Sequence, residues 1–208
     1  MDFLHHAGAE ATNRLVEAES LMRRALAIDE SSFGTDHHRV AIKLNNLGQL
    51  LQATNRLVEA ESLMRRALAI DEASFGMDHP DVARDLNNLA LLLKATNRLA
   101  EAEPLVRRAL AIDEASFGMD HPDVARDLNN LALLLKATNR LAEAEPLYRR
   151  ALEIVLQFTA ATGHPHPNNK IFRSNYHCLL TAMGRSEEEI GRALADLDQR
   201  YGVDLSGE

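Results

Sequence analysis

A repeat of 42 residues constrains this chain more than any other feature. Residues 65–105 recur without a change as residues 107–147, and the earlier segment Thr12–Glu30 recurs unchanged as Thr54–Glu72. A period of this length is typical of a stack of similar units, each packed mainly on its neighbours. The length of 208 residues therefore does not indicate a number of globular domains.

The composition favours helices and a soluble protein. Hydrophobic residues make up 46% of the chain, but aromatic residues only 4% and tryptophan none, so leucine and alanine supply most of the apolar surface. The net charge of −8 disfavours binding to nucleic acid, which requires a basic surface. A single cysteine, Cys178, permits no internal disulfide, and neither a leader nor a membrane-spanning run is visible. We expect a cytoplasmic protein that does not interact with membranes.

One repeat divides into two helices. Pro80 suits the first position of a helix, and apolar residues then follow at helical spacing as far as Ala95. Thr96, Asn97 and Arg98 favour a turn, after which a second helix is expected from about Leu99 to Phe117, where Gly118 ends it. The predicted inward residues are Val82, Leu86, Leu89, Ala90 and Leu93 on the first helix, and Leu99, Ala102, Val106, Ala109 and Leu110 on the second.

Charged residues four positions apart predict ion pairs on the outer surface of the second helices. The pattern Glu103/Arg107 recurs in the other copies as Glu19/Arg23, Glu61/Arg65 and Glu145/Arg149. Histidines recur once per repeat at helix starts, as His79 and His121, which favours a role in capping over metal binding. We expect no metal and no cofactor.

Small residues mark close approaches between helices: Ala90, Ala102 and Ala109 recur as Ala132, Ala144 and Ala151, and as Gly48, Ala60 and Ala67. With the motifs LNNLALLL, R-x-x-EAE-x-L-x-RRAL and FG-x-DHP, this pattern resembles the kinesin light chain type of tetratricopeptide repeat, as found in many bacterial proteins. The resemblance implies an all-α fold, a right-handed superhelix of about five antiparallel helix pairs. The pattern departs at His38, which replaces the connector proline, and near the C-terminus, where Asn175 aligns with Asn130 at a period of 45.

The predicted organisation is a single solenoid over residues 1–208. It begins with a degenerate leading helix at 1–11, because His5, His6 and Gly8 stand where other copies have leucine and small residues. The second helix of the first repeat then covers 12–37. Further repeats are expected at 38–79, 80–121 and 122–165, and the last repeat with its C-terminal cap at 166–208.

In this family the first helices line the concave side, which implies a binding face opposite Leu86 and Leu89. Side-chain amides can hold the backbone of an extended peptide, and basic residues suit acidic side chains. The predicted peptide-binding residues are Arg84, Asn87, Asn88, Leu91 and Lys94, then Arg126, Asn129, Asn130, Leu133 and Lys136, with Asn46 and Asn175 at either side. Alternatively, the asparagines hydrogen-bond to adjacent helices and fix the geometry between repeats.

These observations favour an adaptor that binds a protein or an extended, acidic peptide, and not an enzyme, since no phosphate loop, serine elbow or metal-ligand spacing is present. Two alternatives stay open. The chain could be a self-assembling scaffold, forming a homo-oligomer through its N-terminal end, or a regulatory segment of a larger bacterial signalling or effector protein.

Overall fold

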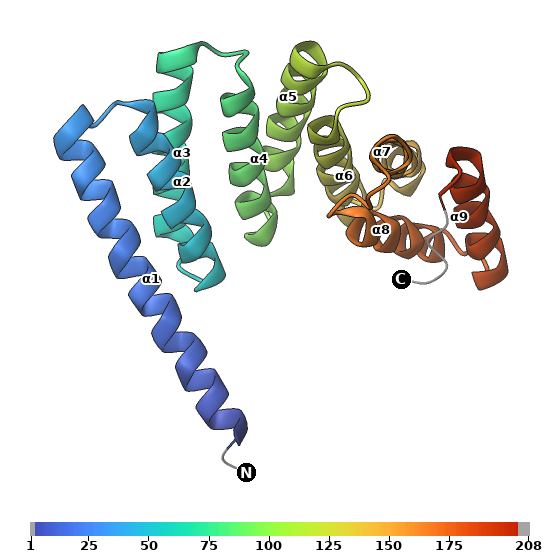
Figure 1. Ribbon diagram of the computed structural model, residues 1–208, viewed down its shortest axis with the longest axis horizontal. Coiled ribbons are helices and arrows are strands. Elements are labelled where there is room, and N and C mark those ends of the chain that lie inside the picture. The colour runs from blue at the N-terminus through green and yellow to red at the C-terminus, as the bar shows by residue number, and fades with distance from the viewer. Residues whose placement is uncertain (1–2, 204–208) are drawn as a thin grey trace. The chain divides into compact units, whose positions relative to one another are not determined.

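The computed structural model describes the backbone of residues 3–203 and the side chains of residues 14–203. All regular secondary structure in this part of the chain is helical (Figure 1). The helices are α1 Phe3–Phe33, α2 His38–Ala53, α3 Leu57–Phe75, α4 Pro80–Ala95, α5 Leu99–Phe117, α6 Pro122–Ala137, α7 Leu141–Thr162, α8 Asn169–Ala182 and α9 Glu187–Tyr201. The chain divides into two compact units, residues 1–98 and residues 99–208.

The first helix of each central repeat begins and ends where its local sequence predicts. The helix expected from near Pro80 to near Ala95 is α4, and its copy α6 has the same pattern of caps. Before α4, the Nδ1 atom of His79 accepts a hydrogen bond from the backbone N–H of Asp81 at 3.1 Å, which satisfies one free donor of the first turn. The ring of Phe75 stacks on that of His79 with 4.4 Å between centroids, and the ring of Phe117 stacks on that of His121 at 4.5 Å before α6.

The Thr-Asn-Arg turns reverse the chain within a helix pair. Asn55, between α2 and α3, has φ of 61°, and Asn139, between α6 and α7, has φ of 59°. Asparagine tolerates this left-handed conformation better than most residues. The hydroxyl of Thr54 donates to the backbone carbonyl of Leu50 at 3.1 Å and so satisfies an acceptor at the helix end.

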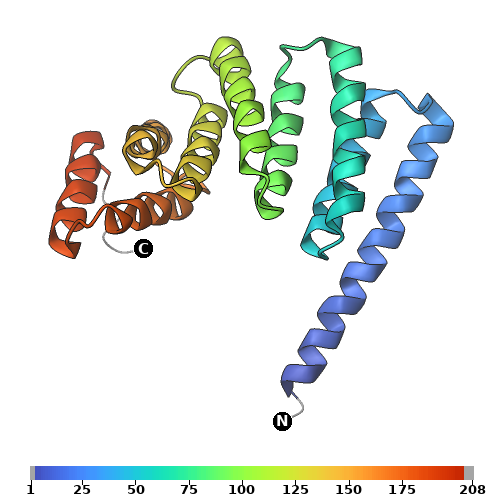
Figure 2. The same cartoon turned by 180° about the vertical axis from the view of Figure 1, so that it is seen from behind.

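α1 differs from the expected pattern because it passes through Thr12, Asn13 and Arg14 without a turn. It is one unbroken helix, shown from behind in Figure 2, where a leading helix over residues 1–11 followed by a turn was expected. A turn is favoured when the leading helix can pack its apolar face on the helix that follows. The leading residues lack that leucine pattern, so continuation of the helix satisfies more backbone hydrogen bonds. The side chains of residues 1–13 lie outside the described part.

The small residues of the repeat lie where first and second helices touch. In the first unit, Val40, Ala41 and Leu44 of α2 pack against Ala67 and Ile70 of α3. Next to this cluster, a Cβ atom on Gly48 would lie 2.9 Å from Cγ of Met64, so the α2 backbone approaches α3 closely. The predicted small residues Ala60, Ala102, Ala109, Ala144 and Ala151 are likewise fully buried.

The C-terminal repeat of the second unit has its own packing. α9 is capped by Ser186 and Glu189 in a capping box and buries Ile190 and Leu197. One predicted ion pair is wrong here: Arg149 pairs with Glu153 at 3.2 Å, and Glu145 instead accepts a hydrogen bond from the Tyr176 hydroxyl at 2.8 Å. Glu153 replaces the alanine of the other copies and therefore competes for the arginine.

The other three predicted pairs are present, with nitrogen–oxygen distances of 2.9 Å for Glu19/Arg23, 2.8 Å for Glu61/Arg65 and 2.7 Å for Glu103/Arg107. None of the helices in residues 3–203 has both the length and the apolar character needed to span a bilayer.

Candidate functional site

In the first unit, the predicted peptide-binding residues lie on α2 and α4, which are in contact. Asn46 is exposed, Asn88 and Lys94 are half-buried, and Leu91 keeps 37% of its surface exposed. Asn87 is buried. Four of these five residues are therefore accessible to a ligand on one pair of adjacent first helices.

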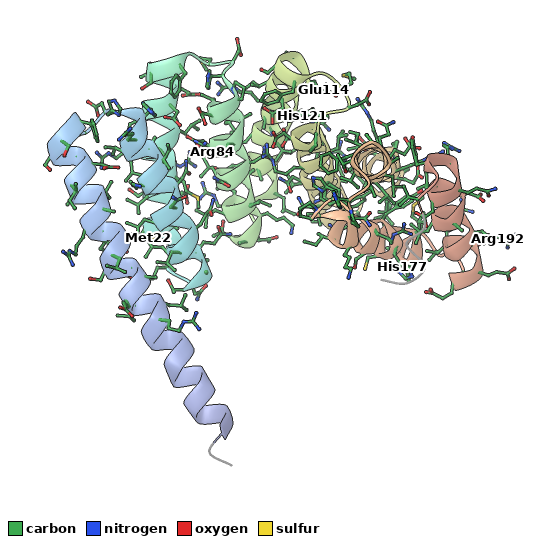
Figure 3. The ribbon with its side chains drawn as sticks, viewed as in Figure 1. Met22, Arg84, Glu114, His121, His177 and Arg192 are labelled. Carbon is green, nitrogen blue, oxygen red and sulfur yellow. The ribbon has the colours of Figure 1, made fainter. Side chains whose placement is uncertain are left out.

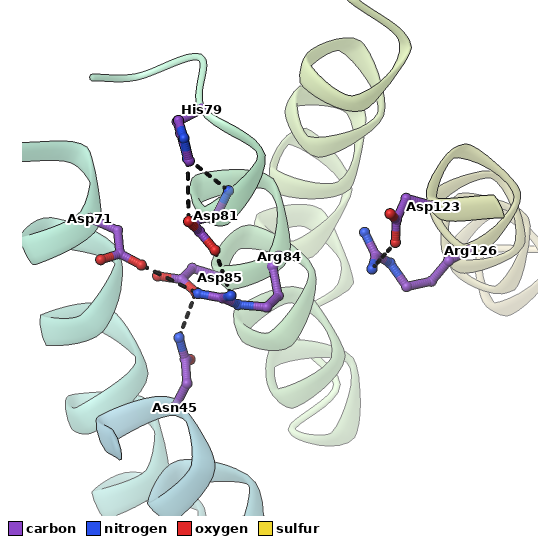
Figure 4. Close-up of polar contacts among 8 residues, drawn as sticks. All are labelled: Asn45, Asp71, His79, Asp81, Arg84, Asp85, Asp123 and Arg126. Carbon is purple, nitrogen blue, oxygen red and sulfur yellow. Dashed lines mark hydrogen bonds and ion pairs between the residues drawn. The ribbon is translucent and has the colours of Figure 1, made fainter. Parts of the chain in front are cut away.

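Arg84 is tied to carboxylates of its own unit (Figure 4). Its guanidinium lies 2.5 Å from an oxygen of Asp81, 3.4 Å from Asp71 of α3 and 3.4 Å from Asp85. The Asp71 and Asp85 side chains are almost completely buried. The amide of Asn45 on α2 also donates to Asp85 at 2.5 Å, so the cluster joins α2, α3 and α4.

Burial raises the pKa of Asp85 to about 7, and the negative charge of Asp71 adds to the increase, while Arg84 opposes it. Burial also raises the pKa of Asp71, and a hydrogen bond from Asp85 partly offsets this increase. Two carboxyl groups this close share a proton near neutral pH. The positive charge of Arg84 is then already neutralised by the carboxylates of Asp71, Asp81 and Asp85.

The second unit contains the same arrangement around Arg126. Its guanidinium lies 2.6 Å from Asp123, 3.0 Å from the buried Asp113 and 3.1 Å from the buried Asp127. Burial raises the pKa of Asp127 to about 7, and Arg126 opposes this increase. Both arginines that were predicted to meet an acidic ligand are thus paired within the fold.

Lysine provides a positive charge on these faces that no carboxylate in the described part of the chain neutralises. Lys94 on α4 and Lys136 on α6 are half-buried. Neither ammonium group forms an ion pair with a carboxylate among residues 14–203. Leu133, one turn before Lys136, is also half-buried.

Two of the predicted asparagines join adjacent helices, and two others are buried. Asn175 of α8 donates to the side-chain carbonyl of Asn129 on α6 at 2.8 Å, and Asn129 is buried. Asn87 is buried and donates to the backbone carbonyl of Ala83 at 3.1 Å. Asn130 is also buried. Asn129 and Asn175 therefore match the alternative role, in which asparagines fix the geometry between adjacent helices.

Sequence reasoning missed the buried aspartates. Asp85 and Asp127 follow Arg84 and Arg126 directly, inside the apolar run of a first helix, while Asp71 and Asp113 come from the preceding second helix. A signal was present, because an acidic residue between Ala83 and Leu86 lies next to the inward stripe. The aspartate that each arginine contacts on the preceding second helix, however, lies 13 residues earlier in the chain, and sequence spacing within one helix does not reveal it.

A separate cavity of about 440 Å³ opens among α7, α8 and α9 of the second unit. It is lined by Ala142, Glu145, Tyr176, Leu180, Met183, Arg185, Glu189 and Ala193. Its polar groups already pair, because Tyr176 donates to Glu145 and Arg185 lies 3.7 Å from Glu189. The first-helix faces, which present amides and apolar side chains together, are the better candidate for a ligand.

Among the described side chains, no group of three or more histidine, cysteine or acidic residues has a geometry that could hold a metal ion.

A family model described as tetratricopeptide repeat matches residues 7–73, 39–115 and 87–157. No curated protein matches the chain.

Solved structures share the fold. BtubC (BKLC) from P. vanneervenii is 23% identical with a TM-score of 0.75, and the match covers 96% of this chain and 77% of that protein. A Podospora anserina protein with nearly identical TPR-like repeats, assigned as a kinesin light chain, is 21% identical with a TM-score of 0.71, covering 91% and 89%. YrrB, described as a TPR protein with an unusual peptide-binding site, is 17% identical with a TM-score of 0.51, covering 91% and 81%.

Proposed function

Because the chain belongs to the tetratricopeptide repeat family and has the fold of kinesin light chain-like repeat proteins, we propose that it binds an extended peptide segment of a partner protein. The binding surface is the accessible face of the first helices. Proteins of this repeat type are in general interaction modules, and YrrB, which shares the fold, is described as having a peptide-binding site.

One observation carries this proposal: apolar and amide side chains are exposed together on α2 and α4. Ile42 and Leu91 keep 38% and 37% of their surfaces exposed, and each shares a helix face with an accessible asparagine, Asn46 or Asn88. An amide can donate to and accept from a peptide backbone, while an apolar side chain contributes by losing contact with water. This combination suits an extended segment that carries an apolar residue.

Lysine supports a preference for acidic peptides. Lys94 lies on the same face as Leu91, and Lys136 lies on the same face of α6 as Leu133. A flexible ammonium group attracts a carboxylate without the fixed geometry of an arginine. In the second unit, Ile171 is exposed on α8, which adds an apolar side chain there.

Selection of the full chain against a random peptide library tests this proposal. We expect peptides that bind the native protein to lose binding to a variant with Asn88→Ala and Leu91→Asp. A matched control is Val58→Asp, which places the same charge on a side chain of α3 that is 87% exposed. Enriched peptides that bind both variants equally, or the lack of any enriched peptide, would contradict the proposal.

The acidic preference is tested separately with Lys94→Ala and Lys136→Ala in the same selection. We expect the peptides enriched by the native chain to contain aspartate or glutamate, and this preference to be lost in the double variant. If the enriched peptides are neutral or basic, binding at this face persists as a proposal but its acidic specificity is wrong.

A further inference from the structure

Two identical segments of the first unit lie in different surroundings. Thr12–Glu30 forms most of the described part of α1, and the same residues form Thr54–Glu72, most of α3. α3 packs on both α2 and α4, whereas α1 packs on α2 and reaches α3 through side-chain ion pairs. Comparison of the two identical segments therefore shows which side chains become covered when a first helix packs on the segment from its N-terminal side.

The difference is concentrated on one face. Ile70 of α3 is 5% exposed, while the equivalent Ile28 of α1 is 59% exposed. Ala60, Met64 and Ala67 are fully buried in α3. Their equivalents Ala18, Met22 and Ala25 in α1 are only half-buried, and Leu21 is 56% exposed. We call the residues Ala18, Leu21, Met22, Ala25 and Ile28 the outer face of α1; Met22 is labelled in Figure 3.

A second pair of equivalent residues shows that the two helices do not differ in exposure at every position. Val16 is 63% exposed, and its equivalent Val58 is 87% exposed, although α3 has a helix on either side. Val16 therefore lies outside the surface that a preceding helix would cover. On the opposite side of α1, Leu26 packs against the core cluster formed with α2.

The cover on α3 has a specific chemistry. α2 places Val40, Ala41 and Leu44 against Ala67 and Ile70, and brings Gly48 against Met64. The pattern of valine, alanine and leucine followed by a small residue recurs in α4 and α6, as Val82, Ala83, Leu86 and Ala90 and as Val124, Ala125, Leu128 and Ala132. A helix with this pattern is complementary to the outer face of α1, since the side chains of that face are those that α2 covers on α3.

Two arginines extend this complementarity. In α3 and the turn before it, Arg56 pairs with Glu19 at 2.7 Å and Arg66 pairs with Glu30 at 2.8 Å, both on the preceding second helix. The equivalent residues of α1 are Arg14 and Arg24. Neither has an ion-pair partner among the side chains from residue 14 to residue 203. A preceding helix pair with glutamates at the repeat positions would supply both partners.

We propose that the outer face of α1 binds an amphipathic helix of the α2 type, supplied by a second polypeptide that contains the same kind of repeat. Its valine, alanine and leucine cover Ala25 and Ile28, and its small residue lies against Met22. Glutamates of the adjoining second helix pair with Arg14 and Arg24. The donated helix must not be paired with a second helix of its own, because the corresponding residues of α2, α4 and α6 are buried in this chain. A second copy of this chain is therefore the poorer donor.

A labelled peptide with the sequence of residues 38–53 tests this surface when it is titrated into the full chain and fluorescence anisotropy is followed. We expect saturable binding that becomes at least tenfold weaker with Ile28→Glu. The matched control Val16→Glu changes a similarly exposed β-branched residue of the same helix and should bind as the native chain does. Circular dichroism confirms that both variants retain their helices, and a peptide with Leu44→Glu should not bind.

Three outcomes would overturn the proposal. No saturable binding would show that the outer face does not accept this helix. Equal affinity for the native chain and Ile28→Glu would place the peptide elsewhere, for example on α3 after displacing α2. A dimer in sedimentation velocity that Ile28→Glu dissociates would show that a second copy occupies the face.

Discussion

Each unit buries a pair of carboxyl groups, Asp71 with Asp85 and Asp113 with Asp127, beside one arginine. In the unfolded chain these aspartates ionise near their ordinary pKa of 3.8, whereas in the fold the pKa of Asp85 and that of Asp127 are about 7. Between these values the native state holds more protons than the unfolded state. The stabilisation is therefore complete at low pH and is lost as the pH rises through about 7.

We expect the free energy of unfolding in urea to be lower at about pH 8.5 than at about pH 5.5 by about 1 kcal/mol or more, since one unit of pKa shift corresponds to about 1.4 kcal/mol. The double variant Asp85→Asn and Asp127→Asn has no titratable group at these positions and should lose this part of the pH dependence. A native chain whose pH dependence matches that of the double variant would show that these carboxyl groups ionise normally.

The arginine in each cluster is predicted to be structural. Replacing Arg84 with methionine leaves two buried carboxyl groups without their cation, and we expect a loss of about 2 kcal/mol in unfolding free energy. This is less than for a fully buried ion pair, because the Arg84 side chain is 39% exposed. Lys94→Met removes a cation from the same helix and should change stability by less than about 0.5 kcal/mol. Urea unfolding of both variants measures the difference, and equal effects would contradict the structural role.

The environment of Arg84 also shows what the sequence could not provide at the scale of single residues. Helical spacing placed Arg84 on α4 correctly, and its neighbours Leu91 and Lys94 are accessible as expected. Its partner Asp71 comes from another helix, and spacing along one helix carries no information about that contact. Asn88 follows the buried Asn87, and Asn46 follows the buried Asn45, each about 100° further around its helix, and in these two helices that step separates buried from accessible.

Among the elements, close contact between α2 and α3 makes Ala60 sensitive to size. Ala60 is fully buried, and its carbonyl lies 3.4 Å from the position that a Cβ on Gly48 would occupy. We expect Ala60→Leu to cost about 1–3 kcal/mol by overpacking this contact. Val58→Leu adds a methylene to an exposed position of the same helix and should have almost no effect. Thermal unfolding compares them, and a similar melting temperature for both would show that the helices are less closely packed.

α1 offers a second prediction, because Thr12–Glu30 is identical to Thr54–Glu72. Replacing residues 1–11 with a copy of residues 38–53 recreates the sequence of the α2–α3 pair at the start of the chain. We expect this chimera to turn at Asn13, cover Ile28 and melt at least about 3 °C higher, since about 1 kcal/mol corresponds to 2–4 °C at this size. In the chimera, Ile28→Glu should become destabilising, whereas in the native chain it should be nearly neutral. A chimera that melts at the native temperature would count against a complementary outer face.

The bounds of α4 and α5 were predictable because their signals are local: Pro80 at a start, Thr96 to Arg98 in a turn and Gly118 after an end. The course of α1 was not, because the same residues, Thr, Asn and Arg, form a turn at 54–56 and continue a helix at 12–14. What decides between the two is the ability of the preceding residues to form a packed first helix. That is a tertiary condition, and the local sequence of the turn does not contain it.

For the whole molecule, the repeat allows a deletion with a seamless junction. Removing residues 80–121 joins His79 to Pro122 and leaves the same local sequence as the native His79–Pro80. We expect the shortened chain to stay helical and to unfold cooperatively, with an m-value in urea reduced to roughly four-fifths, since the m-value scales with the surface exposed on unfolding.

The control for this experiment is a deletion of residues 80–100, half of a repeat, which joins a connector directly to the first turn of α5. This chain has no first helix to cover its next second helix and should lose much of its helical signal in circular dichroism. Equal helicity in the two shortened chains would show that the 42-residue period is not the unit of folding.

The unchanged repetition of whole helices also affects how the chain reaches its structure. An α2 that forms early meets two second helices, α3 and α5, that are the same in sequence from Arg65 to Phe75 and from Arg107 to Phe117. The wrong pairing encloses a long loop, whose closure costs only slightly more entropy than that of a short one. Native pairing thus has a small local advantage, so refolding should show slow phases in which mispaired helices separate. At high protein concentration the same ambiguity extends to neighbouring molecules, and yield should fall with concentration during refolding.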